Sequence, residues 1–199
     1  MEWDGLFEDL EDQLASGWEA ERAALDAEAE RVRFARIELR ARLAALVADA
    51  PALNATLTDG TTMRGRLRAT GADWAALDLS ETHSTALLPF GAVVQWGLDH
   101  GSVLASGSTQ APLSPLRERM TMGFVLRDLA RRRTGVALRV RPGTLLAGTI
   151  DRAGSDHLDL ALHDAGEARR SHAVRGFRLI PFDAVMTVIV GDTAGSALG

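Results

Sequence analysis

The chain of 199 residues contains no cysteine, no tyrosine and no lysine. Without cysteine it has no disulfide, no thiolate zinc site and no cysteine nucleophile. Its 22 basic residues are all arginine, and together with the many alanines and glycines this is typical of a GC-rich bacterial genome. Aromatic residues make up only 5% of the chain, which leaves few rings for stacking on nucleic-acid bases.

Long apolar runs are also missing. No run approaches the ~20 residues that a membrane-spanning helix needs. The first residues are acidic and lack the apolar segment of a signal peptide. We therefore expect a cytoplasmic protein that makes no contact with a membrane.

Sequence motifs of common enzymes are absent as well. The chain has no phosphate-binding glycine loop, no dinucleotide fingerprint and no nucleophile elbow. A cluster of histidines and aspartates occurs late in the chain, but its spacing matches no metal motif: Asp156, His157, Asp159, His163, Asp164 and His172. The sequence predicts a protein that is not an enzyme and has no metal, no cofactor and no small-molecule substrate.

The first fifty residues have a helical pattern. Between residues 3 and 47 there is no proline, and apolar residues recur every seven positions at Trp18, Leu25, Val32, Leu39 and Leu46. A second apolar seam is missing, so a continuous coiled coil is not expected. The single stripe predicts a helix that lies on the rest of the chain or on another copy, with Trp3, Phe7, Trp18 and Leu25 as contact residues. Gly17 is a position where the helix could divide.

The remainder of the chain contains an internal repeat. With an offset of 83, Gly65 falls on Gly148 and Asp73 on Asp156, and each set is followed by alternating apolar residues. The stretches "LLPFGAVV" and "LIPFDAVM" match with an offset of 92, because the second copy has a longer hairpin between its third and fourth strands. Each copy predicts five strands. A helix over 115–132, with Ser114 as N-cap and Pro115 at its first position, precedes the second set.

This pattern resembles the Sm-like (LSm) family, over residues 52–98 and 135–190. The resemblance implies a short helix and a strongly bent five-stranded antiparallel barrel, a shape shared with SH3-like barrels. In that family the fourth strand of one subunit commonly pairs with the fifth of the next to form rings, and many members bind RNA. The usual RNA-binding asparagine is replaced by Leu77 and Leu160, and the second RNA motif is replaced by "LPFGAVV" and "IPFDAVM". Gly65 and Gly148 are expected to mark a bend or a close backbone contact, and Asp73 and Asp156 to cap a turn.

The expected fold class is therefore mainly β with α. It comprises a long N-terminal helix and two small five-stranded Sm-like or SH3-like antiparallel barrels in tandem, each preceded by a helix. The expected organisation is an acidic helical arm (1–50), a first barrel (51–100), a linker (101–113), a helix with a second barrel (114–191) and a disordered tail (192–199).

Two functions follow from these features. The first is a non-catalytic scaffold or regulatory module that binds a protein partner or associates with itself, since small sheets expose edge strands. The second is RNA or DNA binding, because residues 117–152 contain nine arginines and three acids and arginine binds phosphate. The arginines predicted to contact phosphate are Arg127, Arg131, Arg132, Arg133, Arg139, Arg141, Arg169 and Arg170.

Overall fold

The computed structural model describes residues 3–107, 115–164, 170 and 172–191, and for residues 3–12 the backbone alone. It divides the chain into two compact units, Met1–Glu38 and Leu39–Gly199. The first unit contains one helix, α1 (Trp3–Ala35), which runs through Gly17 without a break. A single glycine inside a helix costs only about 1 kcal/mol, which is too little to divide a helix of this length.

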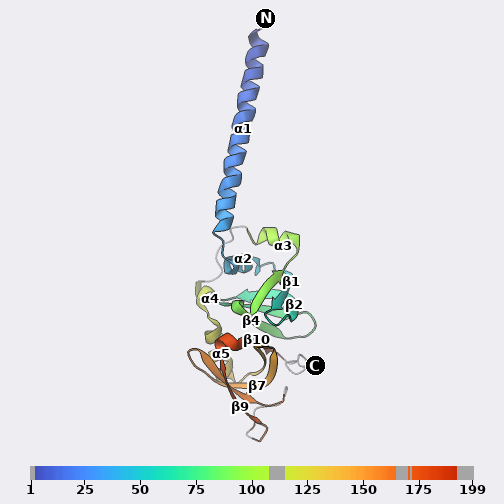
Figure 1. Ribbon diagram of the computed structural model, residues 1–199, viewed down its shortest axis with the longest axis vertical. Helices are drawn as coiled ribbons and strands as arrows, with labels where there is room; N and C mark the ends of the chain where they lie inside the picture. Colours follow the sequence, from blue (N-terminus) through green and yellow to red (C-terminus); the bar gives the residue numbers. More distant parts are fainter. Residues whose placement is uncertain (1–2, 108–114, 165–169, 171, 192–199) are drawn as a thin grey trace. The chain divides into compact units, whose positions relative to one another are not determined.

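Within the described residues, the second unit contains four short helices and ten strands, and Figure 1 shows how they are arranged. The helices are α2 (Leu39–Leu46), α3 (His100–Ala105), α4 (Pro115–Arg119) and α5 (Met122–Arg132), with 3-10 turns η1 (Phe90–Ala92) and η2 (Phe182–Ala184). The strands of the first half are β1 (Ala52–Leu57), β2 (Thr62–Thr70), β3 (Trp74–Leu79), β4 (Thr85–Pro89) and β5 (Val93–Gly97). Those of the second half are β6 (Gly135–Val140), β7 (Thr144–Ala153), β8 (His157–Leu162), β9 (Gly176–Pro181) and β10 (Val185–Val190).

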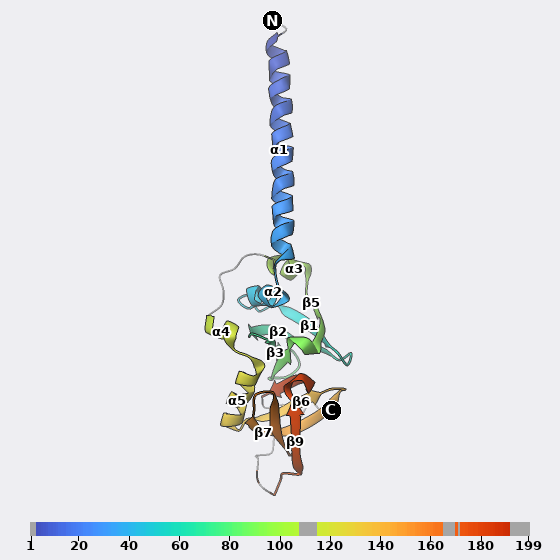
Figure 2. The ribbon, with the colours of Figure 1, turned by 60° about the vertical axis from the view of Figure 1, so that its left-hand side comes forward.

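The ten strands form one open antiparallel sheet in the order β5-β1-β2-β3-β4-β10-β6-β7-β8-β9. The expectation of two separate closed barrels is therefore wrong. The reason is that β4 of the first half pairs directly with β10 of the second half, so the two sets of strands share one hydrogen-bonded ladder. Figure 2 shows the strands of the two halves meeting within the second unit.

The two halves repeat each other in register as well as in sequence. Leu53 pairs with Gly65 between β1 and β2, and Val136 pairs with Gly148 between β6 and β7. The β2–β3 ladder has an irregularity after Leu67, and the β7–β8 ladder has one at the equivalent position. The internal repeat is thus a repeat of backbone geometry.

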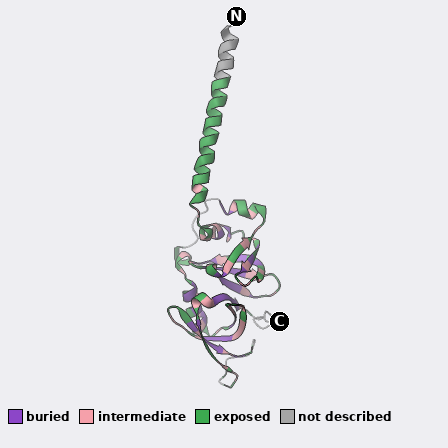
Figure 3. Cartoon of the chain, in the orientation of Figure 1, coloured by how far each residue is buried: buried purple, intermediate pink, exposed green. Residues whose placement is uncertain are grey.

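Hydrophobic packing also crosses between the halves. The core of the first half contains Leu43 and Leu46 of α2 together with Leu67, but it also takes in Met186 from β10. The core of the second half is built around buried residues of α5 and of β6–β8, and it includes Trp74, Ala76 and Leu87 from the first half. Figure 3 shows buried residues concentrated on the strands of this unit. Shared packing of this kind explains why the halves form one compact unit.

The helix expected over 115–132 is interrupted. Helix α4 ends at Arg119, and α5 begins at Met122 with Thr121 as its N-cap, whose hydroxyl accepts a hydrogen bond from the Phe124 N–H (3.3 Å). The expected N-cap, Ser114, lies outside the described residues. The break frees the Met120 carbonyl, which accepts hydrogen bonds from the first half of the chain.

Other boundaries differ in detail from the expected organisation. The first unit ends at Glu38 rather than residue 50, and α2 belongs to the second unit. The expected linker overlaps α3, and the expected tail (192–199) lies outside the described residues. Among the described helices, none has the length and apolar character needed to cross a membrane.

Candidate interaction surfaces

The junction between the halves is a strand pair. In it β4, the fourth strand of the first half, pairs with β10, the fifth strand of the second half, at Leu87–Val188 and Ala86–Ile189. All four of these side chains are buried. The junction therefore combines main-chain hydrogen bonds with an apolar contact, the usual chemistry by which one sheet edge accepts another strand.

A second contact joins the same two halves. The turn between β2 and β3 holds the segment before α5: the Ala72 N–H and the Trp74 Nε1 both donate to the Met120 carbonyl at 2.9 Å. The Asp73 carboxylate accepts a hydrogen bond from the Met122 N–H, at the first turn of α5, at 2.6 Å. A negative charge at a helix N-terminus is stabilising, so Asp73 anchors the helix of the second half to the first half.

The equivalent turn in the second half has no such helix. The Phe182 N–H donates to the Asp156 carbonyl (2.7 Å), as the Phe90 N–H donates to the Asp73 carbonyl (2.9 Å). The Asp156 side chain, however, is 84% exposed, and among the described residues its neighbour His157 contacts it through Nδ1 at 2.8 Å. This hydrogen bond lowers the pKa of the Asp156 carboxyl.

The two mid-strand glycines lie where backbones come close. A Cβ at Gly65 would be 2.5 Å from the Asp78 carbonyl oxygen, and one at Gly148 would be 2.1 Å from that of Ala161. Both distances are shorter than any tolerated contact, so these positions require glycine for space rather than for an unusual φ angle.

The two outer strands of the sheet, β5 and β9, each have one edge without a strand partner among the described residues. These edges carry large exposed apolar side chains: Val94 is 62% exposed, Phe177 60% and Leu179 76%. On β5 the Trp96 indole N–H is buried and has no hydrogen-bond partner within the described part of the chain.

A hollow of about 380 Å³ lies beside β9. Its lining consists of Asp151, Arg152, Asp159, Phe177, Arg178 and Leu179. One carboxylate oxygen of Asp159 is buried without a hydrogen-bond partner in the portion that the structure describes. A buried polar atom without a partner is costly, so a polar group that enters this hollow could bind there.

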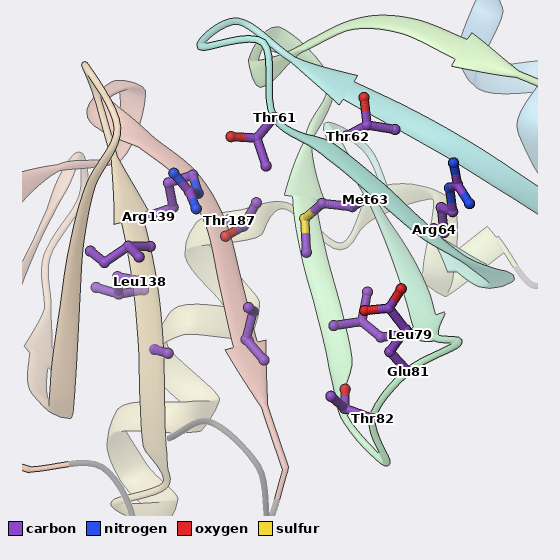
Figure 4. Close-up of a pocket in the computed structure, with 13 residues that line it drawn as sticks. Thr61, Thr62, Met63, Arg64, Leu79, Glu81, Thr82, Leu138, Arg139 and Thr187 are labelled. Carbon is purple, nitrogen blue, oxygen red and sulfur yellow. The ribbon is translucent and has the colours of Figure 1, made fainter. Parts of the chain in front are cut away.

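A cleft of about 420 Å³ separates the halves on one side of the junction (Figure 4). Figure 4 shows Met63, Leu79 and Thr82 on the side of the first half and Leu138 and Arg139 on the other. Its remaining lining residues are Thr61, Thr62, Arg64, Glu81, Ala137, Leu145, Thr187 and Ile189. The lining combines threonine hydroxyls, apolar side chains and the charged Arg64, Glu81 and Arg139, and it contains no histidine.

One ion pair lies at the rim of this cleft. Arg139 donates to Asp59 at 3.1 Å, and both side chains are largely buried. Burial alone would raise the pKa of the Asp59 carboxyl. Hydrogen bonds from Thr61 and the nearby Arg139 charge outweigh that effect, so the pKa lies below its ordinary value. The pair ties the first half to the second, and Arg139 is therefore engaged in an internal contact.

Four of the arginines predicted to contact phosphate have acidic partners. Arg131 and Arg132 both pair with Asp128, and Arg133 lies 3.6 Å from Asp151. Arg139 pairs with Asp59 as described above. These partners reduce the positive charge that this region can offer to phosphate.

Two of the other predicted arginines donate hydrogen bonds to main-chain carbonyls. Arg127 donates to the Gly154 carbonyl (2.9 Å), and Arg141 donates to the Gly91 carbonyl (3.1 Å). Arg170 is exposed, and Arg169 lies outside the described residues.

The contact residues predicted on the N-terminal helix all lie in α1. Trp18 is 70% exposed and Leu25 is 65% exposed. The side chains of Trp3 and Phe7 lie outside the described residues. Within α1 the stripe residues Trp18, Leu25 and Val32 are exposed, whereas Leu46 at the end of the predicted stripe lies in α2 and is buried.

No protein-family model matches the chain, and no curated protein matches it either. Its function has to be inferred from its own residues.

Sequence reasoning missed the edge residues Phe177 and Leu179. The sequence alone carries no signal for them, because the offset of 92 places Leu179 on Leu87 and only the structure shows that the first is exposed and the second is buried.

Proposed function

We propose that this chain is a non-catalytic interaction module whose copies assemble head to tail, with β9 of one copy adding to β5 of the next. The observation that carries the proposal is the β4–β10 junction. Inside the chain β4, the fourth strand of the first half, pairs with β10, the fifth strand of the second half. The remaining fourth strand, β9, and the remaining fifth strand, β5, form the two ends of the sheet. Two copies can repeat the internal junction between them.

The internal junction supplies the register. Its pairs Leu87–Val188 and Ala86–Ile189 correspond, through the offset of 92, to Leu179–Trp96 and Arg178–Gly97. Leu87, at the internal junction, is 7% exposed, whereas its counterpart Leu179, on β9, is 76% exposed. This difference is expected if β9 lacks the partner strand that β4 has. In the same way Met186 is completely buried in the first core, whereas its counterpart Val94 is 62% exposed.

The helix contact has a counterpart too. Met122, whose N–H is held by Asp73, corresponds through the offset of 83 to Leu39, the first residue of α2. Met122 is 4% exposed, and Leu39 is 52% exposed. Asp156 is the counterpart of Asp73, so in the assembled state it accepts a hydrogen bond from the Leu39 N–H of the next copy.

The resemblance to Sm-like proteins stays a prediction, as does a cytoplasmic location. RNA or DNA binding through the arginines is the alternative prediction. The acidic partners of Arg131, Arg132, Arg133 and Arg139 weigh against it.

The test is sedimentation over a range of concentrations, comparing Leu179→Lys with Leu116→Lys. Leu116 is a matched control because it is 72% exposed and lies on α4, away from both edges. A lysine on an edge strand opposes pairing, and losing one buried leucine, worth about 1.5–3 kcal/mol, weakens binding roughly 10- to 150-fold. We expect the average mass of Leu179→Lys to fall and that of Leu116→Lys to equal the wild type. Equal masses for all three proteins would overturn the proposal.

A further inference from the structure

The apolar stripe of α1 is not explained by assembly through the sheet edges. Leu14 (58% exposed), Trp18 (70%), Leu25 (65%) and Val32 (43%) lie along one side of the helix, since they follow each other by four and seven positions. A helix of 33 residues, about 50 Å long, gains most of its stability from packing an apolar face. This face is exposed throughout its described part, so it is available to pack against a partner helix.

The distribution of charge along α1 favours antiparallel over parallel pairing with a second copy of the helix. The first 21 residues of the chain contain eight acids and no base, whereas Arg31, Arg33 and Arg36 lie near the end of α1. A second copy in parallel orientation would place the eight acids against eight acids, which is repulsive. An antiparallel copy places the acidic segment beside the three arginines.

We propose that α1 pairs with α1 of a second copy in antiparallel orientation, through Leu14, Trp18, Leu25 and Val32. With the twofold axis near residues 21 and 22, Trp18 of one copy lies beside Leu25 of the other, and the acidic segment 8–12 lies beside segment 31–36. Arg31 and Arg33 also pair within their own helix with Glu28 and Glu30. Exposed pairs of this kind are weak, so they do not prevent contacts with a second helix. This contact is independent of the one proposed at the sheet edges.

The orientation can be measured directly because the chain has no cysteine. Single cysteines are introduced at Gln13, Glu21 and Glu30, each carries a spin label, and distances between copies are measured by pulsed dipolar spectroscopy. The Leu179→Lys background removes edge-to-edge assembly, so that the distances report on α1 alone. The antiparallel pair predicts a short distance for Glu21→Cys and one of about 25 Å between helix backbones for Gln13→Cys, from 1.5 Å per residue. An equal mixture of Gln13→Cys and Glu30→Cys gives a new short distance.

The specificity control compares two variants that each add one negative charge, on opposite faces of α1. Leu25→Glu places it in the stripe, and Ala27→Glu places it on the opposite side of the helix. We expect Leu25→Glu to weaken association at least tenfold and Ala27→Glu to leave it unchanged. Short distances at all three single-label positions would show parallel pairing, and the absence of any dipolar signal would show that α1 does not pair with a second copy. Either result overturns the proposal, and neither bears on assembly through β5 and β9.

Discussion

Trp74 lies in the first half of the chain but packs in the core of the second, so replacing it tests whether the halves are one folding unit. The side chain is 5% exposed, and its indole N–H donates to the Met120 carbonyl at 2.9 Å. Truncating a buried tryptophan to alanine costs about 3–5 kcal/mol. Trp74→Phe retains most of the apolar contact but removes one of the two hydrogen bonds to the Met120 carbonyl, which costs about 0.5–1.5 kcal/mol. Leu116→Ala, at an exposed position on α4, is the control and should change stability by less than about 0.5 kcal/mol.

The assay is hydrogen-exchange mass spectrometry in increasing urea, which follows peptides from each half separately. With a urea dependence near 2 kcal/mol per molar, Trp74→Ala should lower the unfolding midpoint by about 2 M. Peptides from β1–β3 and from β6–β8 should share that midpoint, because the cores are continuous across the junction. Separate midpoints for the two halves, or a shift confined to the first half, would refute this reasoning.

Three further predictions follow. Because the pKa of Asp59 is depressed, its ion pair with Arg139 stabilises the fold above the ordinary carboxyl pKa of 3.8. This stability is lost as pH falls through the pKa of Asp59 in the folded protein. The difference in melting temperature between wild type and Asp59→Asn should therefore shrink between pH 6 and pH 3. Gly148→Ala should destabilise the protein by about 1–3 kcal/mol or more in thermal melts, because its Cβ meets a carbonyl oxygen at 2.1 Å, whereas Gly135→Ala, with nothing within 4 Å, should be tolerated. Asp156→Ala should weaken self-association, measured by sedimentation. It should not lower the melting temperature of the dissociated chain, because the Asp156 carboxylate is exposed in the single chain. A lower melting temperature would show that Asp156 acts within its own chain.

The sequence was informative wherever a residue acts within its own repeat. Gly65 and Gly148 could be recognised as close backbone contacts because glycine in the middle of a strand is otherwise unfavourable. The internal repeat, together with the alternation of Ala75, Leu77 and Leu79, indicated five strands in each half.

The pairing between repeats was not visible in the same way. Leu87 and Leu179 occupy equivalent positions and are both leucine, yet one is buried at a junction and the other is exposed at an edge. Alternation shows which face of a strand is apolar, but it does not show which strand will pair with a free edge. The closed barrels were wrong for this reason.

Asp73 shows a similar limit. A carboxylate in a tight turn suggests a local cap, whereas its side chain holds the N–H of Met122, 49 positions away. A long-range partner of this kind leaves no mark on local composition.

Assembly through unlike edges is tested most directly by mixing two variants in the Leu25→Glu background, which removes the α1 contact. Leu179→Lys blocks β9 and leaves β5 intact, and Val94→Lys blocks β5 and leaves β9 intact. Head-to-tail pairing predicts that each variant alone sediments as a monomer, while an equal mixture forms a dimer with one intact junction. A mixture that remains monomeric, or a Val94→Lys variant that associates as strongly on its own as the unblocked chain, would contradict the account.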